Sequence, residues 1–303
     1  MKRILKLLKA ISNKMKLSEA SQPFFTDINE EEMYFISDIE HFTKEILQII
    51  KKEIKERKIK LVVLAGDILS FLTKYSEFIK LFEDYSLPIL DLFYNTSKIK
   101  DVNKFHISRE AIGEQISDYI SKDIKKNKGI KNSVKYFKEF LNFCKTNKIN
   151  VLYYSGNHDF LMDGERIRYL SDQMPILKDL FDFDHVYIPY NDLELIQLNK
   201  DLFVMGLHTH SDETNCNEYP KIREFVNSLK SIENPEKIIF VSHIPGKFKF
   251  SKLGSEEITL LKKRFKFKYH YHGHCKNYHD EYLEEGVPTR SVHFNDDLSN
   301  ASD

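Results

Sequence analysis

The amino-acid sequence predicts a mixed α/β fold, and two observations carry this prediction. Apolar segments with strand character alternate with amphipathic segments of helical period along most of the 303 residues. Five of the strand-like segments, far apart in the chain, end in side chains that bind metals. Such a set can work together only if a sheet brings the strand ends to one place. Without an internal repeat or a long linker, we expect a single domain over residues 1–303, with its core at about 33–295.

The first expected strand covers residues 33–37 (MYFIS). An amphipathic helix over 42–58 follows, and the apolar run at 60–66 then predicts a buried strand. Residues 69–148 carry few strand signals but several periodic apolar positions, so we expect a helical insertion there. The lysine-rich stretch at 125–132 within it is typical of a solvated loop.

The rest of the chain is rich in strands. Residues 150–155 (NVLYYS) predict a strand that is followed by a helix reaching about residue 181. Further strand-like segments occur at 185–189, 193–198, 202–207, 237–242, 267–273 and 289–294. The expected order is therefore strand, helix, strand, several helices, strand, helix, three strands, helix and a final group of strands. This alternation is typical of a mixed α/β sandwich.

Composition excludes several classes of protein. Lys plus Arg and Asp plus Glu both number 46, so no overall field attracts nucleic acid, and no basic stripe with interleaved aromatic residues indicates a nuclease. Cys144, Cys216 and Cys275 are odd in number and widely spaced, which argues for a reducing compartment and against a disulfide framework. No apolar run approaches the roughly 20 residues that span a bilayer. We therefore expect a cytoplasmic protein.

Residues 1–18 form a separate feature, a predicted basic amphipathic helix. Ile4, Leu8, Ile11 and Met15 fall on one helical face, and lysines surround the remainder. Such a helix could make a weak contact with an anionic membrane or a partner through residues 1–17. The alternative, which the sequence favours, is a surface helix packed on the domain or a frayed end.

Five short motifs carry the candidate chemistry. FISDIEH, LAGDI, SGNHD, VSHIP and HGHCK place Asp38, Asp67, Asn157 with His158, His243 and His274 at the ends of apolar runs. Carboxylate, amide oxygen and imidazole are the ligands that divalent cations prefer. Each motif alone is weak, because an Asp after a strand commonly caps a helix or turn and a single His is commonly a core residue. The five together, in this order, indicate a metal site.

This series resembles the calcineurin-like metallophosphoesterases, whose pattern is D-x-H, then G-D, G-N-H-[DE], a lone H and G-H-x-H. The similarity runs from about Tyr34 to Lys276. The resemblance implies a sandwich of two mixed β-sheets flanked by helices, with a two-metal centre at the strand ends. It also implies a divalent cofactor, with Mn²⁺ expected first and Fe, Zn or Mg as alternatives.

The resemblance further implies a role for each matching residue. Asp38 would bind the first metal, and Asp67 would bridge both. Asn157, His243 and His274 would complete the second site. His158 would face the scissile phosphate as a general acid or transition-state donor, because an imidazole can donate a proton near neutral pH.

The sequence departs from the family pattern at Glu40 and Lys276, which replace the two histidines of the first metal. Glutamate is an acceptable ligand, but protonated lysine has no lone pair. A unit charge about 4 Å from a dication costs on the order of 8 kcal/mol at an effective dielectric near 20. The sequence therefore favours a weakened or absent first metal, so that one or two ions are bound.

Three arrangements of these residues stay open. Lys276 could pair with Glu40 and occupy the first site. It could instead turn to the substrate phosphate and replace the missing cation there. Alternatively, His41 or His272 could substitute as a ligand while Glu40 stays bound.

Two further features have alternative readings. His208 and His210 lie on one face of an extended segment, where they could contact substrate near the phosphate or belong to a solvent-facing loop. Asp159 could orient His158 or cap the following turn.

Two classes of function agree with this pattern. The first, which is favoured, is metal-dependent hydrolysis of a phosphomonoester or phosphodiester, with the insertion at 69–148 as the expected element of substrate specificity. The alternative is a binding or scaffold protein with a partly degraded metal centre. The natural phosphorylated substrate is not indicated by any segment.

Overall fold

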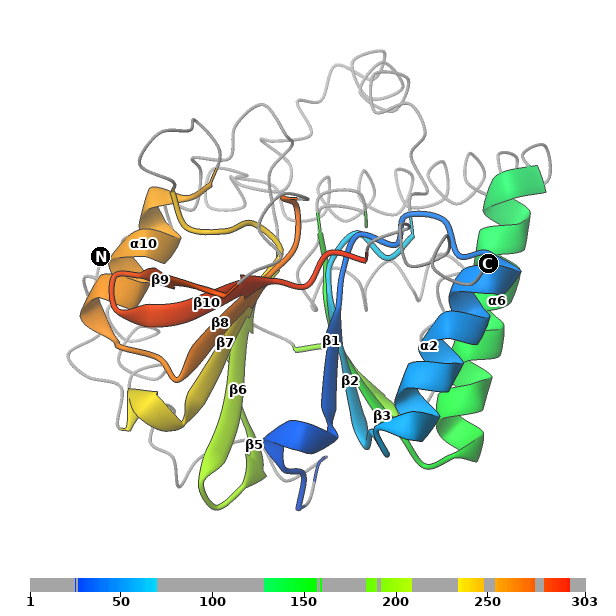
Figure 1. Cartoon of the computed structure of the whole chain (residues 1–303), viewed down its shortest axis with the longest axis horizontal. Coiled ribbons are helices and arrows are strands. Elements are labelled where there is room, and N and C mark those ends of the chain that lie inside the picture. Colours follow the sequence, from blue (N-terminus) through cyan, green and yellow to red (C-terminus); the bar gives the residue numbers. More distant parts are fainter. Residues whose placement is uncertain are drawn as a thin grey trace, which may run out of the picture.

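The protein is a sandwich of two β-sheets with helices on the outer faces (Figure 1). The computed structural model describes residues 25, 27–69, 128–156, 159, 184–189, 192–208, 234–247, 254–275 and 281–294. The predicted mixed α/β sandwich is confirmed. The predicted N-terminal helix at 1–18 and most of the insertion at 69–148 lie outside the described residues. The domain boundaries stay a prediction.

The first sheet has the order β1-β2-β3-β4 and is parallel throughout its described strands. Its strands are β1 (Met33–Ile36), β2 (Leu61–Ala65), β3 (Asn150–Tyr154) and β4 (Val186–Tyr187). The 3₁₀ helix η2 (Glu30–Glu32) leads into β1. Every residue of β2 is buried, as expected for a parallel strand that is covered on both faces.

The second sheet is mixed and has the order β5-β6-β7-β8-β10-β9. Its strands are β5 (Leu195–Asn199), β6 (Leu202–Leu207), β7 (Ile238–Ser242), β8 (Tyr269–His272), β9 (Tyr282–Glu284) and β10 (Val287–Ser291). The 3₁₀ helix η4 (Pro235–Lys237) precedes β7. Strands β6, β7, β8 and β10 run parallel, while β5 and β9 are antiparallel to their neighbours.

Three apolar layers hold the sandwich together. Helices α2 (Lys44–Glu56) and α6 (Lys128–Thr146) cover the outer face of the first sheet, and α10 (Glu256–Arg264) covers that of the second (Figure 1). Side chains alternate along each strand, so Val62 and Leu64 face the helices whereas Leu61 and Val63 face the second sheet. Each sheet therefore has an apolar layer on both faces.

Three elements differ from the expectation. The stretch at 125–132 was expected to be a loop, but α6 begins at Lys128. That expectation was wrong for residues 128–132, because the buried positions Val134, Phe137 and Phe140 continue the same helix and outweigh the lysine content. The sequence-based order also lacked α10 and β9.

The signal for α10 was present in the sequence. Ser255 caps the helix by accepting a hydrogen bond from the Ile258 N–H, acidic residues occupy its first turn, and basic residues occupy its last turn. At nine residues the helix is too short for apolar periodicity to identify it.

The carboxyl ends of the parallel strands lie together at the upper edge of the sandwich in Figure 1. At this edge the chain after β10 connects the two sheets. Ser37 N–H donates to the Val292 carbonyl at 3.0 Å and Phe294 N–H donates to the Ser37 carbonyl at 2.9 Å, while Val292 N–H donates to the His272 carbonyl at 2.7 Å. Ligands commonly bind at the carboxyl edge of such sheets.

No helix among the described residues is long and apolar enough to cross a membrane.

The layer between the first sheet and its helices supplies a test of core packing. Phe140 is fully buried and packs against Phe42 and Phe137, with ring centroids 5.8 and 6.1 Å apart. We expect Phe140→Ala to lower the free energy of unfolding by about 3–5 kcal/mol. Leu260→Ala is the control, because Leu260 is 42% exposed and should cost much less. Urea denaturation of both variants measures this, and equal losses would contradict the assignment of Phe140 to the core.

Candidate metal centre

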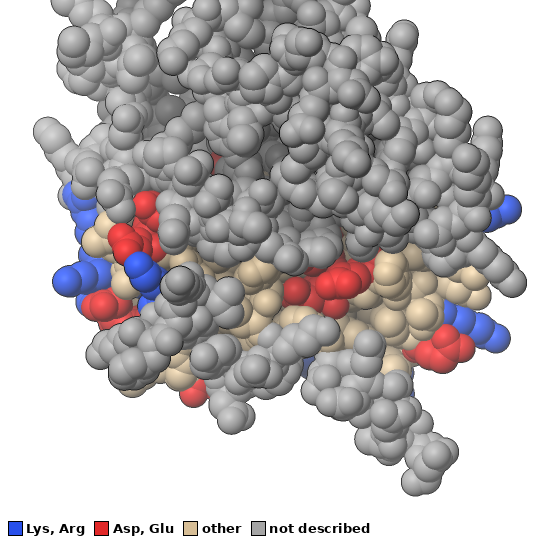
Figure 2. Space-filling model, turned by 90° about the horizontal axis from the view of Figure 1, so that it is seen from above, with Lys and Arg blue, Asp and Glu red and all other residues tan. Residues whose placement is uncertain are grey.

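Four candidate ligands follow the carboxyl ends of four strands. Asp38 lies two residues after β1 and Asp67 two residues after β2, while His243 directly follows β7 and His274 lies two residues after β8. The first sheet therefore supplies two carboxylates and the second supplies two imidazoles. Viewed from above this edge, acidic side chains are visible near the middle of the described surface (Figure 2).

Asp67, His243 and His274 form a compact group. One potential ligand atom from each residue lies within 4.8 Å of the others. Nε2 of His243 is 2.9 Å from Oδ2 of Asp67, and the two imidazole rings meet edge to face with centroids 5.2 Å apart. These spacings bring one carboxylate and two imidazoles around a single point.

The protonation pattern of His243 suits a metal ligand. Its Nδ1–H donates to the Ala65 carbonyl at 3.0 Å, so Nε2 is the nitrogen that carries the lone pair in the neutral ring. Nε2 is buried and has no hydrogen-bond partner among the described residues, because its approach to Asp67 lies outside hydrogen-bond geometry. A buried lone pair next to a buried carboxylate is unfavourable unless a positive charge, from a proton or a metal ion, lies between or beside them.

The charge balance of the group leads to the same conclusion. Burial opposes protonation of His243, but the negative charges of Asp67 and Asp38 outweigh burial and raise the pKa of His243 to about 10. The cluster therefore favours a positive charge at this position. A divalent ion can supply that charge and displace the proton, since metal binding requires the neutral ring.

Asp38 is held next to this group by three hydrogen-bond contacts. Its Oδ2 accepts from the Ser37 hydroxyl at 2.6 Å, and its two oxygens face the His274 N–H at 2.9 and 3.2 Å. The side chain is 5% exposed. The carboxylate that follows β1 is thus tied directly to the backbone of the imidazole that follows β8.

The backbone at these positions is strained. Asp38, Glu40, Asp67 and His274 have φ values of 54, 53, 52 and 63°, in the left-handed region that non-glycine residues rarely adopt. Each such residue costs of order 1–3 kcal/mol, and residues of this kind concentrate at functional sites. Four of them at one edge of the sheets indicate a site that the surrounding fold is built to hold.

Two glycines allow the chain segments to come this close. A Cβ at Gly156 would lie 2.1 Å from Oδ1 of Asp67, and a Cβ at Gly273 would lie 2.4 Å from Oδ2 of Asp38 and 2.8 Å from Nδ1 of His243. No side chain can be accommodated at those distances. Both glycines are therefore required by close approach of the backbone to ligand side chains.

Asp159 fastens two of the ligand-bearing loops together. One of its oxygens accepts from the N–H groups of Ile68 and Leu69 at 2.9 and 3.0 Å, and the other accepts from the Gly156 N–H at 3.0 Å. Burial and the nearby charge of Asp67 raise its pKa to about 6. The sequence had left a turn cap and an orienting role as alternatives. The structure adds a third role, a bridge between the loops after β2 and β3.

Comparison with known proteins identifies the family of this chain. A family model described as calcineurin-like phosphoesterase matches residues 117–275, more than half of the chain. The chain belongs to the calcineurin-like phosphoesterase family. The matched region contains His243 and His274 and begins after Asp38 and Asp67. Among curated proteins, no sequence matches this chain.

Two solved structures are similar to this chain. One crystal structure is similar over 85% of this chain and 88% of its own, at 12% identity and a TM-score of 0.50. Another, of TT1561 from Thermus thermophilus, covers 85% of this chain and 86% of its own, at 10% identity and a TM-score of 0.44. At these identities the first similarity supports the fold alone.

The predicted calcineurin-like site residues fall into two groups. Asp38, Asp67, His243 and His274 lie together, whereas Asn157, His158, His210 and Lys276 lie outside the described residues. The Glu40 N–H donates to the Asp67 carbonyl at 2.9 Å, which places its backbone at the site. The roles assigned to Glu40 and to the residues outside the described part stay predictions.

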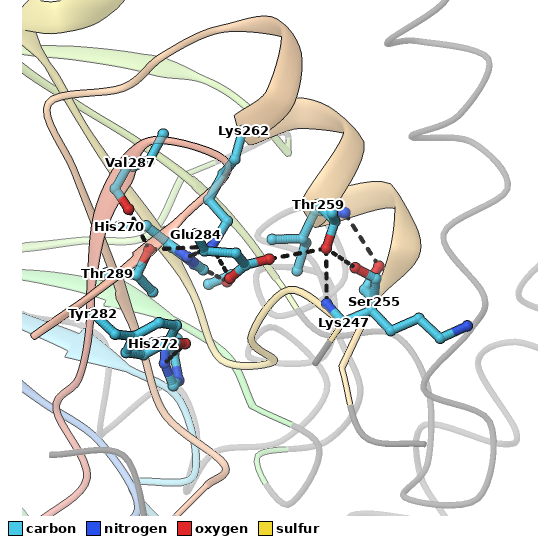
Figure 3. Close-up of polar contacts among 12 residues, drawn as sticks. Lys247, Ser255, Thr259, Lys262, His270, His272, Tyr282, Glu284, Val287 and Thr289 are labelled. Atoms are coloured by element: carbon cyan, nitrogen blue, oxygen red, sulfur yellow. Dashed lines mark hydrogen bonds and ion pairs between the residues drawn. The ribbon is translucent and has the colours of Figure 1, made fainter. Parts of the chain in front are cut away.

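The structure describes both histidines that the sequence suggests as substitute ligands. His41 is exposed. Nδ1 of His272 lies 2.8 Å from the Gly273 carbonyl oxygen, and its Nε2 lies 3.0 Å from the hydroxyl of Tyr282, so both ring nitrogens already have partners (Figure 3). The contacts of His272 argue against a ligand role for this residue, and the role suggested for His41 stays a prediction.

His208 lies inside the protein. Its Nδ1 accepts from the Ser155 N–H at 3.0 Å, so Nε2 carries the proton and faces the Pro189 carbonyl oxygen at 3.2 Å. The ring is fully buried beside Tyr154. These contacts support the end of β3, immediately before the Gly156 loop. A substrate contact through His208 and His210 stays a prediction.

A buried polar network supports the loop that carries His243. Lys262 is fully buried, forms an ion pair with Glu284, and lies 2.9 Å from Nδ1 of His270 and 3.2 Å from the Thr289 hydroxyl (Figure 3). Burial, with the charge of Lys262 as the second cause, lowers the pKa of His270 far below its ordinary value. The neutral His270 can therefore accept from Lys262 through Nδ1 and donate through Nε2.

The network contacts both ends of the loop at residues 243–247, which follows β7. Nε2 of His270 lies 2.8 Å from the Ser242 hydroxyl, which donates to the Ile244 carbonyl at 2.6 Å and so spans His243. At the other end, the Lys247 N–H donates to the Thr259 hydroxyl at 2.8 Å. Thr259 in turn donates to Glu284 at 2.9 Å (Figure 3). The residues around His243 are thus fixed from the α10 side of the sheet.

We expect Gly273→Ala to weaken metal binding by about 10–100-fold, the range seen when contacts that orient ligands are lost. The added methyl group would displace Asp38 or His243. Gly286→Ala is the matched control, because Gly286 has a φ of 79° but its Cβ would meet only Lys266, at 3.6 Å. Isothermal titration of metal-stripped proteins with Mn²⁺ measures both. Unchanged affinity in Gly273→Ala would contradict the packing at the site.

The Lys262 network predicts a pH dependence of stability. Burial lowers the pKa of Lys262 to about 8 from an ordinary 10.5, although Glu284 opposes the shift. Above pH 8 the unfolded chain holds a proton that the folded protein has released, so the stability contributed by this residue rises with pH. The pH range in which this effect can be measured ends near pH 10. Tyrosines of the unfolded chain begin to ionise there, whereas burial raises the pKa of Tyr34 in the folded protein to about 12, so stability falls again with pH.

We therefore expect Lys262→Met to remove part of the rise in unfolding free energy between about pH 8 and 10. Lys263→Met is the control, since Lys263 is the exposed neighbour on the same helix. Urea denaturation at several pH values measures the slope. Identical slopes for Lys262→Met and the wild type would show that Lys262 titrates normally.

Proposed function

We propose that the protein hydrolyses a phosphate ester, a monoester or a diester, with the help of bound divalent metal. The observation that carries this proposal is the convergence of Asp67, His243 and His274, with a buried imidazole nitrogen directed at a buried carboxylate. Membership of the calcineurin-like phosphoesterase family supports the same reaction class. A bound divalent cation supplies a nucleophilic water at neutral pH and offsets charge on the phosphate.

The chain's own residues divide the remaining work. Asp67 and Asp38 both act electrostatically on His243, and in this proposal the Asp67 carboxylate would be the ligand shared by two ions. In this proposal Asn157 completes the set around His243 and His274. His158 donates a proton to the leaving oxygen, as an imidazole can near neutral pH. Lys276 contacts the substrate phosphate.

The mixture of ligands supports a choice of metal. Carboxylate oxygens together with imidazole nitrogens suit Mn²⁺, Fe²⁺ and Zn²⁺, and a site made of oxygen ligands alone would suit Mg²⁺ better. We propose Mn²⁺ as the first ion to test, in a protein that acts in the cytoplasm.

One observation favours a second function. Lys276 stands where the family pattern has a ligand histidine, and a protonated lysine cannot bind a metal. A binding or scaffold protein with a degraded centre is therefore the alternative. His158 argues against it, because a scaffold does not need a proton donor next to a phosphate.

Hydrolysis of nitrophenyl mono- and diesters in Mn²⁺ tests the proposal. We expect turnover by the wild-type protein that is lost on dialysis against a chelator and restored by Mn²⁺. His158→Ala should lower kcat by about 10²–10⁴-fold, the usual contribution of a positioned proton donor. Asn157→Ala should raise the Mn²⁺ concentration needed for activity.

Asn142→Ala is the matched control for the asparagine change, since Asn142 is an exposed residue of α6. It should retain wild-type turnover and metal dependence. Equal, background-level turnover of both esters by the wild type, Asn157→Ala and His158→Ala would end the hydrolase proposal for these substrates. Tight Mn²⁺ binding without turnover would favour the scaffold alternative.

A further inference from the structure

By sequence, the expected first metal site lacks both imidazole ligands of the family pattern, yet the structure places an imidazole next to Asp38. His293 follows the carboxyl end of β10, as His243 and His274 follow β7 and β8. Its Nε2 lies 3.6 Å from Oδ1 of Asp38, and the two side chains are 6% and 5% exposed. A buried imidazole therefore faces the carboxylate that follows β1.

The backbone fixes this arrangement. Ser37 and His293 form a parallel bridge between the end of β1 and the chain after β10. Hydrogen bonds flank the bridge on both sides, from Ser37 N–H to the Val292 carbonyl at 3.0 Å and from Phe294 N–H to the Ser37 carbonyl at 2.9 Å. Because Asp38 is the next residue after Ser37, the register of the bridge itself sets His293 next to Asp38.

The ring of His293 is oriented in the manner of a metal ligand. Nδ1 lies 2.9 Å from the Phe294 carbonyl oxygen, which can only accept a hydrogen bond. In the neutral ring the proton is therefore on Nδ1, and the lone pair of Nε2 is directed toward Asp38. Metal-binding histidines commonly donate their second ring N–H to a backbone carbonyl in this way. His243 has the same arrangement through Ala65.

The distance also suits a shared ion. Ligand bonds of about 2.0–2.2 Å at tetrahedral or octahedral angles separate two ligand atoms by about 3.0–3.5 Å. The separation of 3.6 Å between Nε2 of His293 and Oδ1 of Asp38 is near that range and longer than a hydrogen bond. An ion between these atoms would therefore need little rearrangement.

We propose that His293 is a ligand of the first metal, together with Asp38. In the family pattern the first metal has two histidine ligands, at the positions of Glu40 and Lys276 in this chain. His293 would supply an imidazole in their place. The ion is a divalent cation that accepts both oxygen and nitrogen ligands. This inference rests on the proposed metal centre, but it does not require that the protein turn over any substrate.

Metal binding, measured without reference to activity, tests the assignment. Metal-stripped wild type, His293→Ala and Asp38→Asn are titrated with Mn²⁺ by calorimetry, and bound metal is counted by mass spectrometry. We expect His293→Ala to weaken or abolish binding at one site by at least about 10-fold. The site formed by Asp67, His243 and His274 should be retained. Adding His293→Ala to Asp38→Asn should cause no further loss, because residues that bind one ion are not independent.

A spectroscopic variant tests direct contact. In Co²⁺-loaded His293→Cys, a thiolate bound to the ion would give a thiolate-to-metal charge-transfer band that the wild type lacks. His41→Cys is the matched control, because His41 is exposed and should give no such band. Thermal unfolding of the metal-free variants identifies any loss of binding that follows from misfolding.

The outcomes separate this inference from the proposed function. Unchanged metal count and affinity in His293→Ala, with no charge-transfer band in His293→Cys, would overturn the ligand assignment even if the protein hydrolyses esters. Loss of one ion in His293→Ala, together with the band in His293→Cys, would support the assignment even if every ester tested remains intact.

Discussion

The structure depends on one electrostatic requirement, that of a buried carboxylate facing a buried imidazole. Asp67 and His243 are 2% and 0% exposed, and their nearest atoms are 2.9 Å apart. Water cannot screen them, and neither can be moved without breaking the ends of β2 and β7. A positive charge must be present at this point, as a proton or as a metal ion. The ligand loops, the glycines and the supporting hydrogen bonds all serve to hold this pair in place.

Hydrogen bonds around the site offset the free-energy cost of its strained backbone. Asp38, Glu40, Asp67 and His274 occupy unfavourable backbone conformations, which persist only where the surroundings determine them. Asp159 fastens the loops after β2 and β3 by three backbone hydrogen bonds. On the other sheet, Lys262 and its partners fix the loop around His243. The apolar layers below supply the free energy, and these polar contacts supply the geometry.

Most of the fold could be predicted from the sequence, and so could the grouping of four candidate ligands at one edge of the sheets. Strand ends were identified because apolar runs stop abruptly at polar residues, and this rule correctly placed Asp38, Asp67, His243 and His274 together. It failed for α10, which is too short to show a period, and for residues 128–132, where lysine content concealed the start of α6. Asp159 was ambiguous because its hydrogen-bond partners Ile68 and Leu69 lie 91 and 90 positions away in sequence. His293 could not be singled out from the sequence, because it falls inside the segment 289–294 that is expected to be a strand, whereas β10 ends at Ser291.

The bridge between Ser37 and His293 has a mechanical consequence. The first sheet contributes Asp38 and Asp67 to the centre, and the second contributes His243 and His274, so an ion held among them would join the two sheets at one end of the sandwich. The Ser37–His293 bridge already joins them beside that point. Sliding of one sheet over the other would have to separate the carboxylates from the imidazoles. The opposite rim is joined as well, because the Ile28 N–H before β1 donates to the Leu198 carbonyl of β5 at 3.3 Å, and Lys268 before β8 pairs with Glu30. The two sheets are therefore fastened at both rims, and neither can slide without breaking contacts at each.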